Sequence, residues 1–202
     1  MTIWNTQYLD HVADILAQKP IDKDARPVVF IGSSSFRLWA TLAEDMRILN
    51  FLNAGMGGAT IEDGLDHAAR IFGGLRPAKI YTYFGENDVA CDGLRPEDVF
   101  KQWQRLDAAL QALCPDVPIT HLSAKCGPAR WLWREDIVAA NALVSQGCSS
   151  SSSSRFLDVD SVLIGRNGKP LEKVFEADGI HLNREGYRAW AEVIQIADCT
   201  AT

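Results

Sequence analysis

Short apolar runs recur along this chain, and longer segments with a helical spacing of apolar residues separate them. The runs cover residues 28–31, 48–52, 80–84, 119–122 and 156–159. Short apolar runs bounded by glycine or proline are typical of buried strands, and strands that alternate with helices form parallel sheets with helical crossovers. We therefore predict a three-layer α/β/α fold, in which helices cover both faces of a five-stranded, mostly parallel sheet.

The helices between these runs have recognisable ends. Thr60 can cap a helix, because its hydroxyl can accept an N–H of the first turn, and Gly73-Gly74 can end that helix. Pro96 is suited to the first turn of a second helix, whose apolar residues recur every three or four positions. By the same reasoning, Pro128 opens a third helix and Asn183 caps the last one.

The length of 202 residues suits one domain with a full core. We therefore expect a single domain over residues 1–202, with a helical N-terminal extension at 1–25 whose helix covers 6–18. Six consecutive serines, residues 149–154, lie between a predicted helix and the fifth strand. Such low-complexity sequence predicts a flexible surface loop.

Composition excludes several classes of protein. Hydrophobic residues make up 47% of the chain and charged residues 23%, and the formal net charge is −6. An acidic balance argues against a general binder of nucleic acids or anionic membranes. No apolar run is long enough to insert into a membrane, and no signal peptide is visible, so we expect a cytoplasmic protein.

The cysteines and histidines predict neither a disulfide frame nor a metal site. There are five cysteines and four histidines, all dispersed. No two cysteines follow the Cys-x-x-Cys spacing, and no His-Glu-x-x-His pattern exists. We expect reduced thiols, no metal and no other cofactor.

Four polar motifs follow predicted strands or precede helices: 32–35, 53–58, 85–88 and 178–181. Ligand sites in open parallel sheets lie beyond the carboxyl ends of the strands, so we expect these motifs to meet at one edge. Together they contain a serine, a histidine three residues after an aspartate, and glycine and asparagine amides. This set supplies a nucleophile, a base, a group that orients the base, and donors for an oxyanion.

In order and spacing, these motifs resemble the four blocks of the SGNH hydrolase superfamily, also called GDSL lipases or esterases. The first block of that family is Gly-Asp-Ser after an apolar strand, and residues 30–34 are similar to it. The other blocks are matched by Asn53 and Gly58, by Gly85, Asn87 and Asp88, and by Asp178 and His181. The resemblance extends from the first predicted strand to the last predicted helix. It implies a flavodoxin-like fold and the hydrolysis of esters or thioesters.

The resemblance also implies a role for each matched residue. Ser34 would be the nucleophile, His181 its general base, and Asp178 the carboxylate that orients the base. The amides of Ser34 and Gly58 and the side chain of Asn87 would form the oxyanion hole. The family's aspartate is replaced here by Ser33, and we expect the hydroxyls of Ser33 and Ser35 to share its role in fixing the loop.

Other interpretations of these residues stay open at this point. The run of serines leaves Ser33 and Ser35 as alternative nucleophiles, and Ser34 could simply cap a helix. Asn87 could serve only to shape a turn. The glycines of residues 55–58 could form only a tight turn, or a degenerate dinucleotide loop.

Two further residues are candidates for lining the substrate pocket. Arg130 and Trp131 lie close to the end of the fourth predicted strand. On a helix, Trp131 and Trp133 would point to roughly opposite sides, so at least one of them should pack against the core. Cys126 lies at the same edge but has no base near it in the sequence, which indicates a buried, idle thiol.

The sequence thus predicts a serine esterase acting on small-molecule esters with short acyl groups, acetyl among them. An acyltransferase could use the same site, because an alcohol would then take the place of water. A flavin-binding or phosphate-binding module is the alternative from another class, since a serine-rich loop at a helix N-terminus can bind anions. That module would leave Asp178, His181 and Asn87 without a role.

Overall fold

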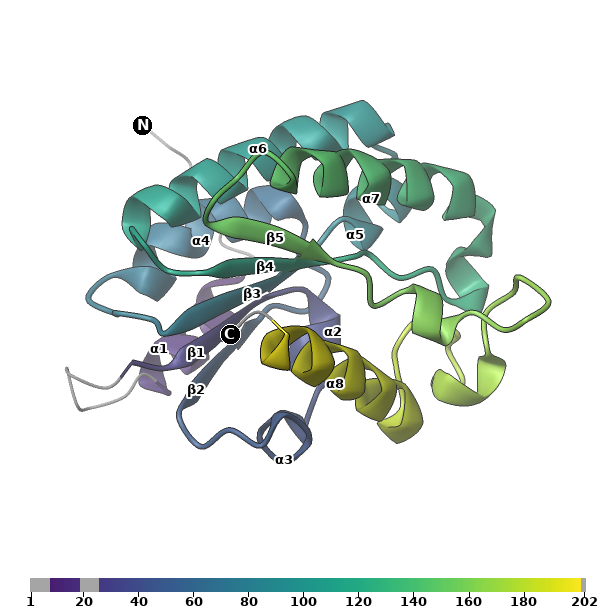
Figure 1. Ribbon diagram of the computed structural model, residues 1–202, viewed down its shortest axis with the longest axis horizontal. Helices are drawn as coiled ribbons and strands as arrows, with labels where there is room; N and C mark the ends of the chain where they lie inside the picture. The colour runs from purple at the N-terminus through teal and green to yellow at the C-terminus, as the bar shows by residue number, and fades with distance from the viewer. Residues whose placement is uncertain (1–7, 19–25, 201–202) are drawn as a thin grey trace.

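A computed structural model describes residues 8–18 and 26–200 of the chain. Its five strands form one sheet in the order β2-β1-β3-β4-β5, and every neighbouring pair is parallel. The strands are β1 (Val28–Gly32), β2 (Phe51–Gly55), β3 (Lys79–Tyr83), β4 (Ile119–Leu122) and β5 (Ser154–Leu157). The predicted five-stranded α/β fold is confirmed (Figure 1).

Eight α-helices are present in the described part of the chain. They are α1 (Leu9–Ala17), α2 (Ser34–Arg37), α3 (Leu42–Met46), α4 (Ile61–Phe72), α5 (Glu86–Ala90), α6 (Pro96–Leu113), α7 (Arg134–Cys148) and α8 (Arg184–Cys199). Short 3-10 helices occur at η2 (Pro128–Trp133), η3 (Ser161–Leu163) and η4 (Glu172–Val174). Among these helices, none is both long and apolar enough to cross a membrane.

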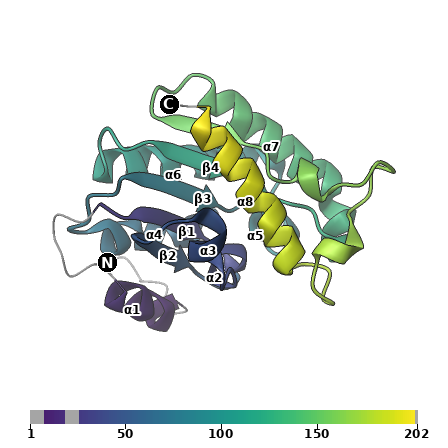
Figure 2. The same cartoon turned by 60° about the horizontal axis from the view of Figure 1, so that its bottom comes forward.

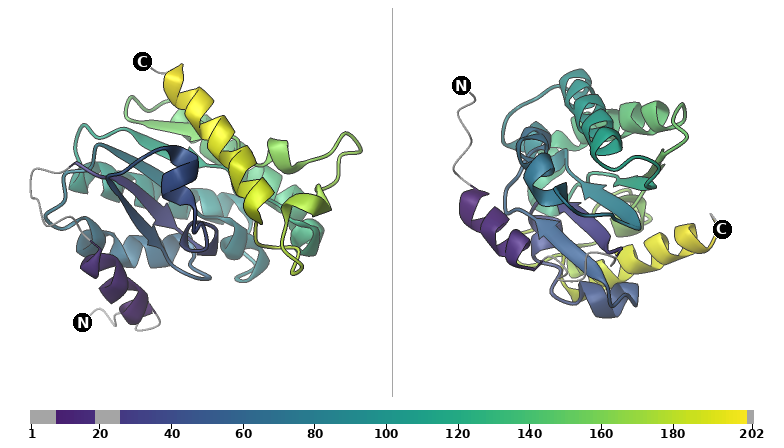
Figure 3. Two further views of the ribbon diagram at one scale, coloured as in Figure 1. Left: turned by 90° about the horizontal axis from the view of Figure 1, so that it is seen from below. Right: turned by 90° about the vertical axis from the view of Figure 1, so that its left-hand side faces the viewer.

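Two hydrophobic cores lie on opposite faces of the sheet, because successive side chains of a strand point to opposite faces. Val29 and Ile31 of β1 belong to the core that α1, α4, α6 and α7 cover. Phe30, between them, belongs to the core under α2, α3 and α8. Figure 2 shows α8 crossing the second face, and the two views of Figure 3 show the sheet between the helical layers.

The predicted helix ends are largely those observed. Thr60 caps α4 in a reciprocal capping box, in which the Thr60 N–H donates to Asp63 Oδ2 at 2.9 Å. Asn183 caps α8, where its Oδ1 accepts the N–H of Glu185 at 3.0 Å. Pro96 is the first residue of α6. The predicted N-terminal helix is present as α1, although residues 6–7 and most of the 1–25 extension lie outside the described residues.

Several boundaries differ from the prediction. The second strand is Phe51–Gly55 rather than 48–52, and the fifth is Ser154–Leu157 rather than 156–159. The serine run is not entirely a loop, because Ser154 pairs with Ile119, is buried, and donates its hydroxyl to Asp107. The hydrogen-bonding register therefore sets where these strands begin, whereas the apolar runs locate them only approximately and include exposed residues such as Leu49.

The segment after Pro128 also differs from the prediction. It starts with the 3-10 helix η2, and the α-helix begins only at Arg134. The five-residue helices α3 and α5 were not predicted. Helices of about one turn are too short to show a hydrophobic period, which explains why the sequence pattern does not reveal them.

Candidate active site

The carboxyl ends of β1, β2 and β3 bring three of the polar motifs together. The Met56 N–H donates to Gly32 O at 2.8 Å, and the Ser33 N–H donates to Tyr83 O at 3.1 Å. Helix α2 packs directly on the end of β2. A Cβ at Gly55 would lie only 2.2 Å from the Arg37 nitrogen, so a side chain there would push α2 away.

Asn53 helps to hold the turn that carries Ser34. Its Nδ2 donates to Phe36 O at 2.7 Å, and its Oδ1 accepts the Gly55 N–H at 3.0 Å. The role expected for the hydroxyls of Ser33 and Ser35 thus falls, at least in part, to backbone groups and to Asn53. Asn53 is the middle residue of β2, and only the fold brings it to its partner Phe36 O on α2.

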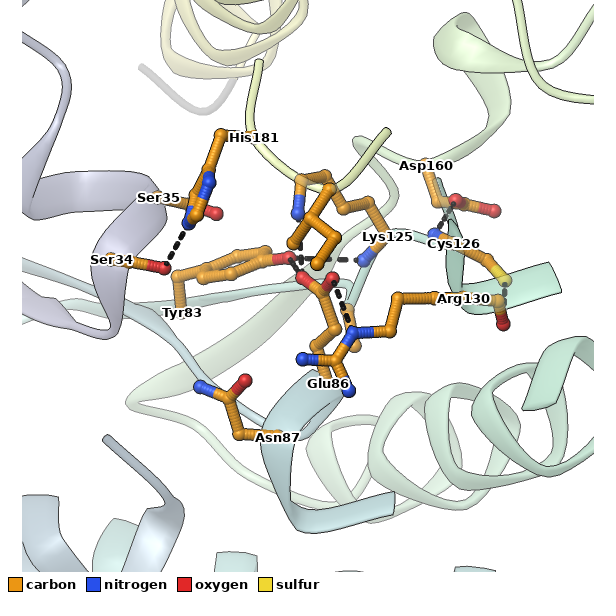
Figure 4. Close-up of polar contacts among 12 residues, drawn as sticks. Ser34, Ser35, Tyr83, Glu86, Asn87, Lys125, Cys126, Arg130, Asp160 and His181 are labelled. Atoms are coloured by element: carbon orange, nitrogen blue, oxygen red, sulfur yellow. Dashed lines mark hydrogen bonds and ion pairs between the residues drawn. The ribbon is translucent and has the colours of Figure 1, made fainter. Parts of the chain in front are cut away.

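Ser34, His181 and Asp178 form a continuous hydrogen-bonded line. Ser34 Oγ lies 3.0 Å from His181 Nε2 (Figure 4), and His181 Nδ1 lies 2.6 Å from Asp178 Oδ2. A carboxylate can only accept, so Nδ1 carries the ring proton and Nε2 is free to accept from the serine. The neighbouring Ser33 and Ser35 are 3% and 1% exposed, and the structure places Ser34 rather than either of them against the imidazole.

A tight turn holds Asp178 in its ionised form. Its Oδ1 accepts the N–H groups of Ile180 and His181, at 2.8 and 2.9 Å. Although partial burial opposes ionisation, these N–H groups and the His181 ring lower the pKa of Asp178 to about 2. Asp178 is therefore an anion at any pH near neutrality and can stabilise an imidazolium on His181.

Helix α8 aligns the histidine with the serine. It begins two residues after Leu182, and the Tyr187 hydroxyl on its second turn donates to Ser35 O at 2.9 Å. On the other side, the Ala129 N–H donates to Gly179 O at 3.1 Å, which ties the Asp178–His181 turn to η2. The turn is thus attached at both ends, and this attachment preorganises the line of three residues.

Among the described residues, each of the three donors predicted for the oxyanion hole keeps one N–H without an acceptor. Within residues 8–18 and 26–200, the amides of Ser34 and Gly58 have no hydrogen-bond acceptor, and Gly58 has a φ of 79°, which favours glycine. Asn87 Nδ2 donates one of its two N–H groups to Ala59 O at 3.0 Å, which leaves the other free. The Asn87 side chain is therefore linked to the loop that carries Gly58.

Asp88 anchors the same loop. Its two carboxylate oxygens accept the N–H groups of Ile61 and Gly85, at 2.9 and 3.0 Å. Burial raises the pKa of Asp88 to about 6, although these N–H groups oppose that rise. Asp88 thus joins the start of α4 to the start of α5 and fixes the backbone that presents Asn87.

A family model described as the GDSL-like lipase/acylhydrolase family matches residues 30–189. This chain belongs to that family. The match spans all four motifs, and the family's activity makes this GDSL-like protein a hydrolase of the broad ester-cleaving class. No curated protein matches the sequence.

Solved structures share the fold of this GDSL-like protein. A candidate acylhydrolase from Bacteroides fragilis is 22% identical with a TM-score of 0.78, over 100% of this chain and 99% of that one. A GDSL-like lipase from Bacteroides thetaiotaomicron is 21% identical with a TM-score of 0.72, over 96% and 98% of the two chains. A carbohydrate esterase of family 3 from Talaromyces cellulolyticus is 15% identical with a TM-score of 0.64, over 87% and 97%.

The GDSL-like site contains a buried polar network that sequence analysis missed. Glu86 Oε2 accepts from Lys125 Nζ at 2.6 Å and from the Tyr83 hydroxyl at 2.8 Å (Figure 4). Burial, followed by the charge of Glu86, raises the pKa of Tyr83 far above its usual range, so the phenol keeps its proton. The sequence shows Glu86 and Lys125 only as polar loop residues, and nothing in it reveals that Lys125 is fully buried.

The two candidate substrate-lining residues have different surroundings. Arg130 extends from η2 toward Glu86 (Figure 4), and its Nε lies 4.0 Å from Glu86 Oε1. Trp131 is partly buried against the core beside α7, and the Arg134 guanidinium lies 5.4 Å from its ring centre. Trp133 packs against the same core, so both tryptophans have a packing role.

Cys126 is buried, as the sequence predicts. Its thiol donates to Arg130 O at 3.2 Å, and burial raises the pKa of that thiol to about 11. A thiol with such a pKa stays protonated near neutrality and is a poor nucleophile. Cys126 therefore supports η2 rather than competing with Ser34.

Proposed function

We propose that this protein hydrolyses carboxylic esters through an acyl-enzyme formed on Ser34. The observation that carries the proposal is the hydrogen-bonded line of Asp178, His181 and Ser34, with distances of 2.6 and 3.0 Å. Its second support is that an N–H group of each of Ser34, Gly58 and Asn87 has no acceptor among the described residues. Both features are what acyl transfer requires, because one activates the nucleophile and the other stabilises the charge that the attack creates.

The first half of the reaction forms the acyl-enzyme. His181 Nε2 removes the Ser34 proton as Oγ attacks the ester carbonyl carbon, and Asp178 stabilises the imidazolium. The carbonyl oxygen becomes an oxyanion held by the amides of Ser34 and Gly58 and by Asn87 Nδ2. When the tetrahedral intermediate collapses, the bond to the alcohol oxygen breaks, and His181 donates its proton to that oxygen.

The second half restores the serine. His181 removes a proton from a water molecule, whose oxygen attacks the acyl carbon, and collapse releases the carboxylic acid with Ser34 reprotonated. The His181 side chain is 27% exposed and that of Asp178 45%, so water can reach the imidazole. Easy access of water favours hydrolysis over transfer to an alcohol.

The proposed substrates are esters of short acyl groups, acetyl among them, with Arg130 and Trp131 beside the substrate. The loops around the site are rich in small or polar residues, among them Asp92, Gly93 and Gly127. A long acyl chain needs an extensive apolar surface, since each buried methylene contributes only about 0.8 kcal/mol. The carbohydrate esterase among the structural neighbours makes an acylated sugar one candidate of this class.

The acyl preference can be tested with acetyl, butyryl, octanoyl and palmitoyl esters of one alcohol, below their aggregation limits. We expect kcat/KM to be highest for the acetyl or butyryl ester and to fall as the chain lengthens, because the longer chains find little apolar surface to bury. A steady rise toward palmitoyl would refute the short-acyl proposal while leaving the serine mechanism intact.

The serine mechanism itself is tested by the pH profile of aryl acetate hydrolysis. An imidazole can accept a proton only when it is neutral, so kcat/KM should fall about tenfold per pH unit on the acid side once His181 becomes protonated. Asp178 does not produce this fall, because its pKa is lowered to about 2 and it stays charged until far more acidic pH.

The control for this profile is His181→Ala, whose residual activity should lack the acid-side ionisation. Each sample is returned to neutral pH and assayed again, so that acid unfolding is separated from titration. Wild-type activity that shows no acid-side fall at any pH at which the protein stays folded would show that a histidine base is wrong. Absence of turnover with every ester would contradict the proposed function as a whole.

A further inference from the structure

We propose that Arg130 binds an anionic group of the substrate, a carboxylate or a phosphate monoester, and that esters carrying such a group are preferred. This inference rests on the proposed function, because it names the substrate class of the same site. It follows from a guanidinium that is almost buried, held beside Asn87, and left without an oxygen acceptor.

The Arg130 guanidinium lacks the partners that a buried arginine normally has. Its side chain is only 13% exposed, and its Nε finds no hydrogen-bond acceptor among the described residues. The nearest carboxylate oxygen, Glu86 Oε1, is 4.0 Å from Nε, which is too long for a hydrogen bond. Both Nη atoms lie 3.3 Å from Cys91 Sγ, and sulfur is a weak acceptor.

Among the described residues, Glu86 offers the one carboxylate within 4.0 Å of the Arg130 guanidinium. Glu86 already accepts from Lys125 Nζ at 2.6 Å, so one carboxylate serves two cations, Lys125 and Arg130. The next cation along the chain, Arg134, forms its own ion pair with Asp160 and does not alter this balance. One positive charge thus remains in a largely desolvated place, which is costly unless an anion joins it.

The fork of the guanidinium faces the C-terminal end of α5, the helix that carries Asn87. Cys91 Sγ, which both Nη atoms contact, lies 3.9 Å from Asn87 Oδ1, one turn back along the chain. Figure 4 shows the guanidinium beside Glu86, and Cys91 Sγ connects it to Asn87. Cys91 is exposed, so a ligand can reach this position from solvent. An anion bound here would lie close to the carbonyl oxygen of the ester, to which Asn87 Nδ2 donates in the proposed mechanism.

The backbone and ring contacts of Arg130 hold it ready for a ligand. Its N–H donates to Gly127 O at 3.0 Å, and its carbonyl accepts from Cys126 Sγ at 3.2 Å. The guanidinium carbon lies 6.0 Å from the Trp133 ring centre. A planar guanidinium fixed in this way offers two parallel N–H groups, which match the oxygens of a carboxylate or a phosphate.

The test compares matched pairs of esters that differ only in one anionic group. On the acyl side, the aryl monoester of glutaric acid is paired with the aryl ester of pentanoic acid. On the alcohol side, the acetyl ester of glycolic acid is paired with that of 2-methoxyethanol, and acetylglycerol 3-phosphate with acetylglycerol. The three pairs separate a carboxylate on the acyl group from a carboxylate or a phosphate on the alcohol.

In at least one pair, we expect wild-type kcat/KM to be about tenfold to a hundredfold higher for the anionic ester, the range typical of a charge-assisted hydrogen bond. In Arg130→Gln the ratio within that pair should fall to about one. Arg130→Lys should keep part of the preference, because it retains the charge but loses the fork. Arg105→Gln, which removes an exposed cation paired with Glu62 at the surface, should leave the ratio unchanged.

The outcomes separate this inference from the proposed function. Equal rates for anionic and neutral esters in all three pairs, or a preference that survives in Arg130→Gln, would overturn the inference alone. If Arg130→Gln does not fold, the ratio of kcat/KM between anionic and neutral esters in Arg130→Lys decides the question. A preference in that variant equal to that of the wild type would contradict the role of the two parallel guanidinium N–H groups. Failure of the wild type to hydrolyse any ester would overturn the proposed function and this inference with it.

Discussion

Replacing Ser34 by alanine should lower kcat by about a thousandfold or more, because the acyl-enzyme can no longer form. Ser34 Oγ is placed 3.0 Å from His181 Nε2, whereas the flanking serines are buried and make no hydrogen bond to the imidazole, and Ser35 Oγ has no hydrogen-bond partner among the described residues. The loss should appear mainly in kcat, since the attack occurs only after the ester has bound. Steady-state hydrolysis of an aryl acetate measures it, with unfolding temperatures confirming that the variant is folded.

A serine-directed phosphonate identifies the nucleophile independently of turnover. We expect one label per chain, and fragmentation of the labelled peptide should place it on Ser34. Ser35→Ala is the matched control, because it removes a neighbouring hydroxyl whose residue is 1% exposed, and it should keep most of the activity and all of the labelling. A label on Ser33 or Ser35 would refute the assignment.

Replacing Asn87 by alanine should lower kcat by roughly 10²–10³, with much less change in KM, because an oxyanion donor is used mainly in the transition state. Asn87 Nδ2 gives one N–H to Ala59 O and keeps the other for the substrate. The variant therefore loses a catalytic donor and one loop contact together. Kinetic constants for a short-acyl ester, measured beside the unfolding temperature, quantify both losses.

Asp88→Asn separates these two losses. Asp88 holds the same loop through the N–H groups of Ile61 and Gly85 but offers no donor to the substrate. An amide there would turn an NH₂ toward one of those N–H donors, so we expect a lower unfolding temperature and a smaller fall in kcat than in Asn87→Ala. If the two variants lose kcat equally, or Asn87→Ala has near-normal kcat, Asn87 serves only to shape the loop.

The order of short apolar runs and helical segments determined the layers of this protein. Strands that alternate with crossover helices must run parallel, and their carboxyl ends must meet at one edge, so the position of the polar motifs in the chain was enough to locate a candidate site. Local features such as the Thr60 cap could also be predicted, because the hydrogen-bonding partners of a capping residue lie within one helical turn of it.

Only the tertiary structure decided which serine meets the histidine. Ser33, Ser34 and Ser35 are chemically equivalent in the sequence, and the direction of each side chain depends on the start of α2 and on the docking of α8 against it. The strand boundaries could not be predicted from the sequence either, because hydrogen-bond register is set by pairing between different chain segments.

The network around Glu86 shows the limit most clearly. Lys125 follows Glu86 by 39 positions, yet the two form a fully buried ion pair, and Arg130 is left with only a distant carboxylate oxygen. The local sequence reveals the spacing of apolar residues and the residue types suited to turns, because neighbours along the chain are also neighbours in space. Burial, ion pairing and unpaired charge arise between segments that are remote in the sequence, so only the tertiary structure reveals them.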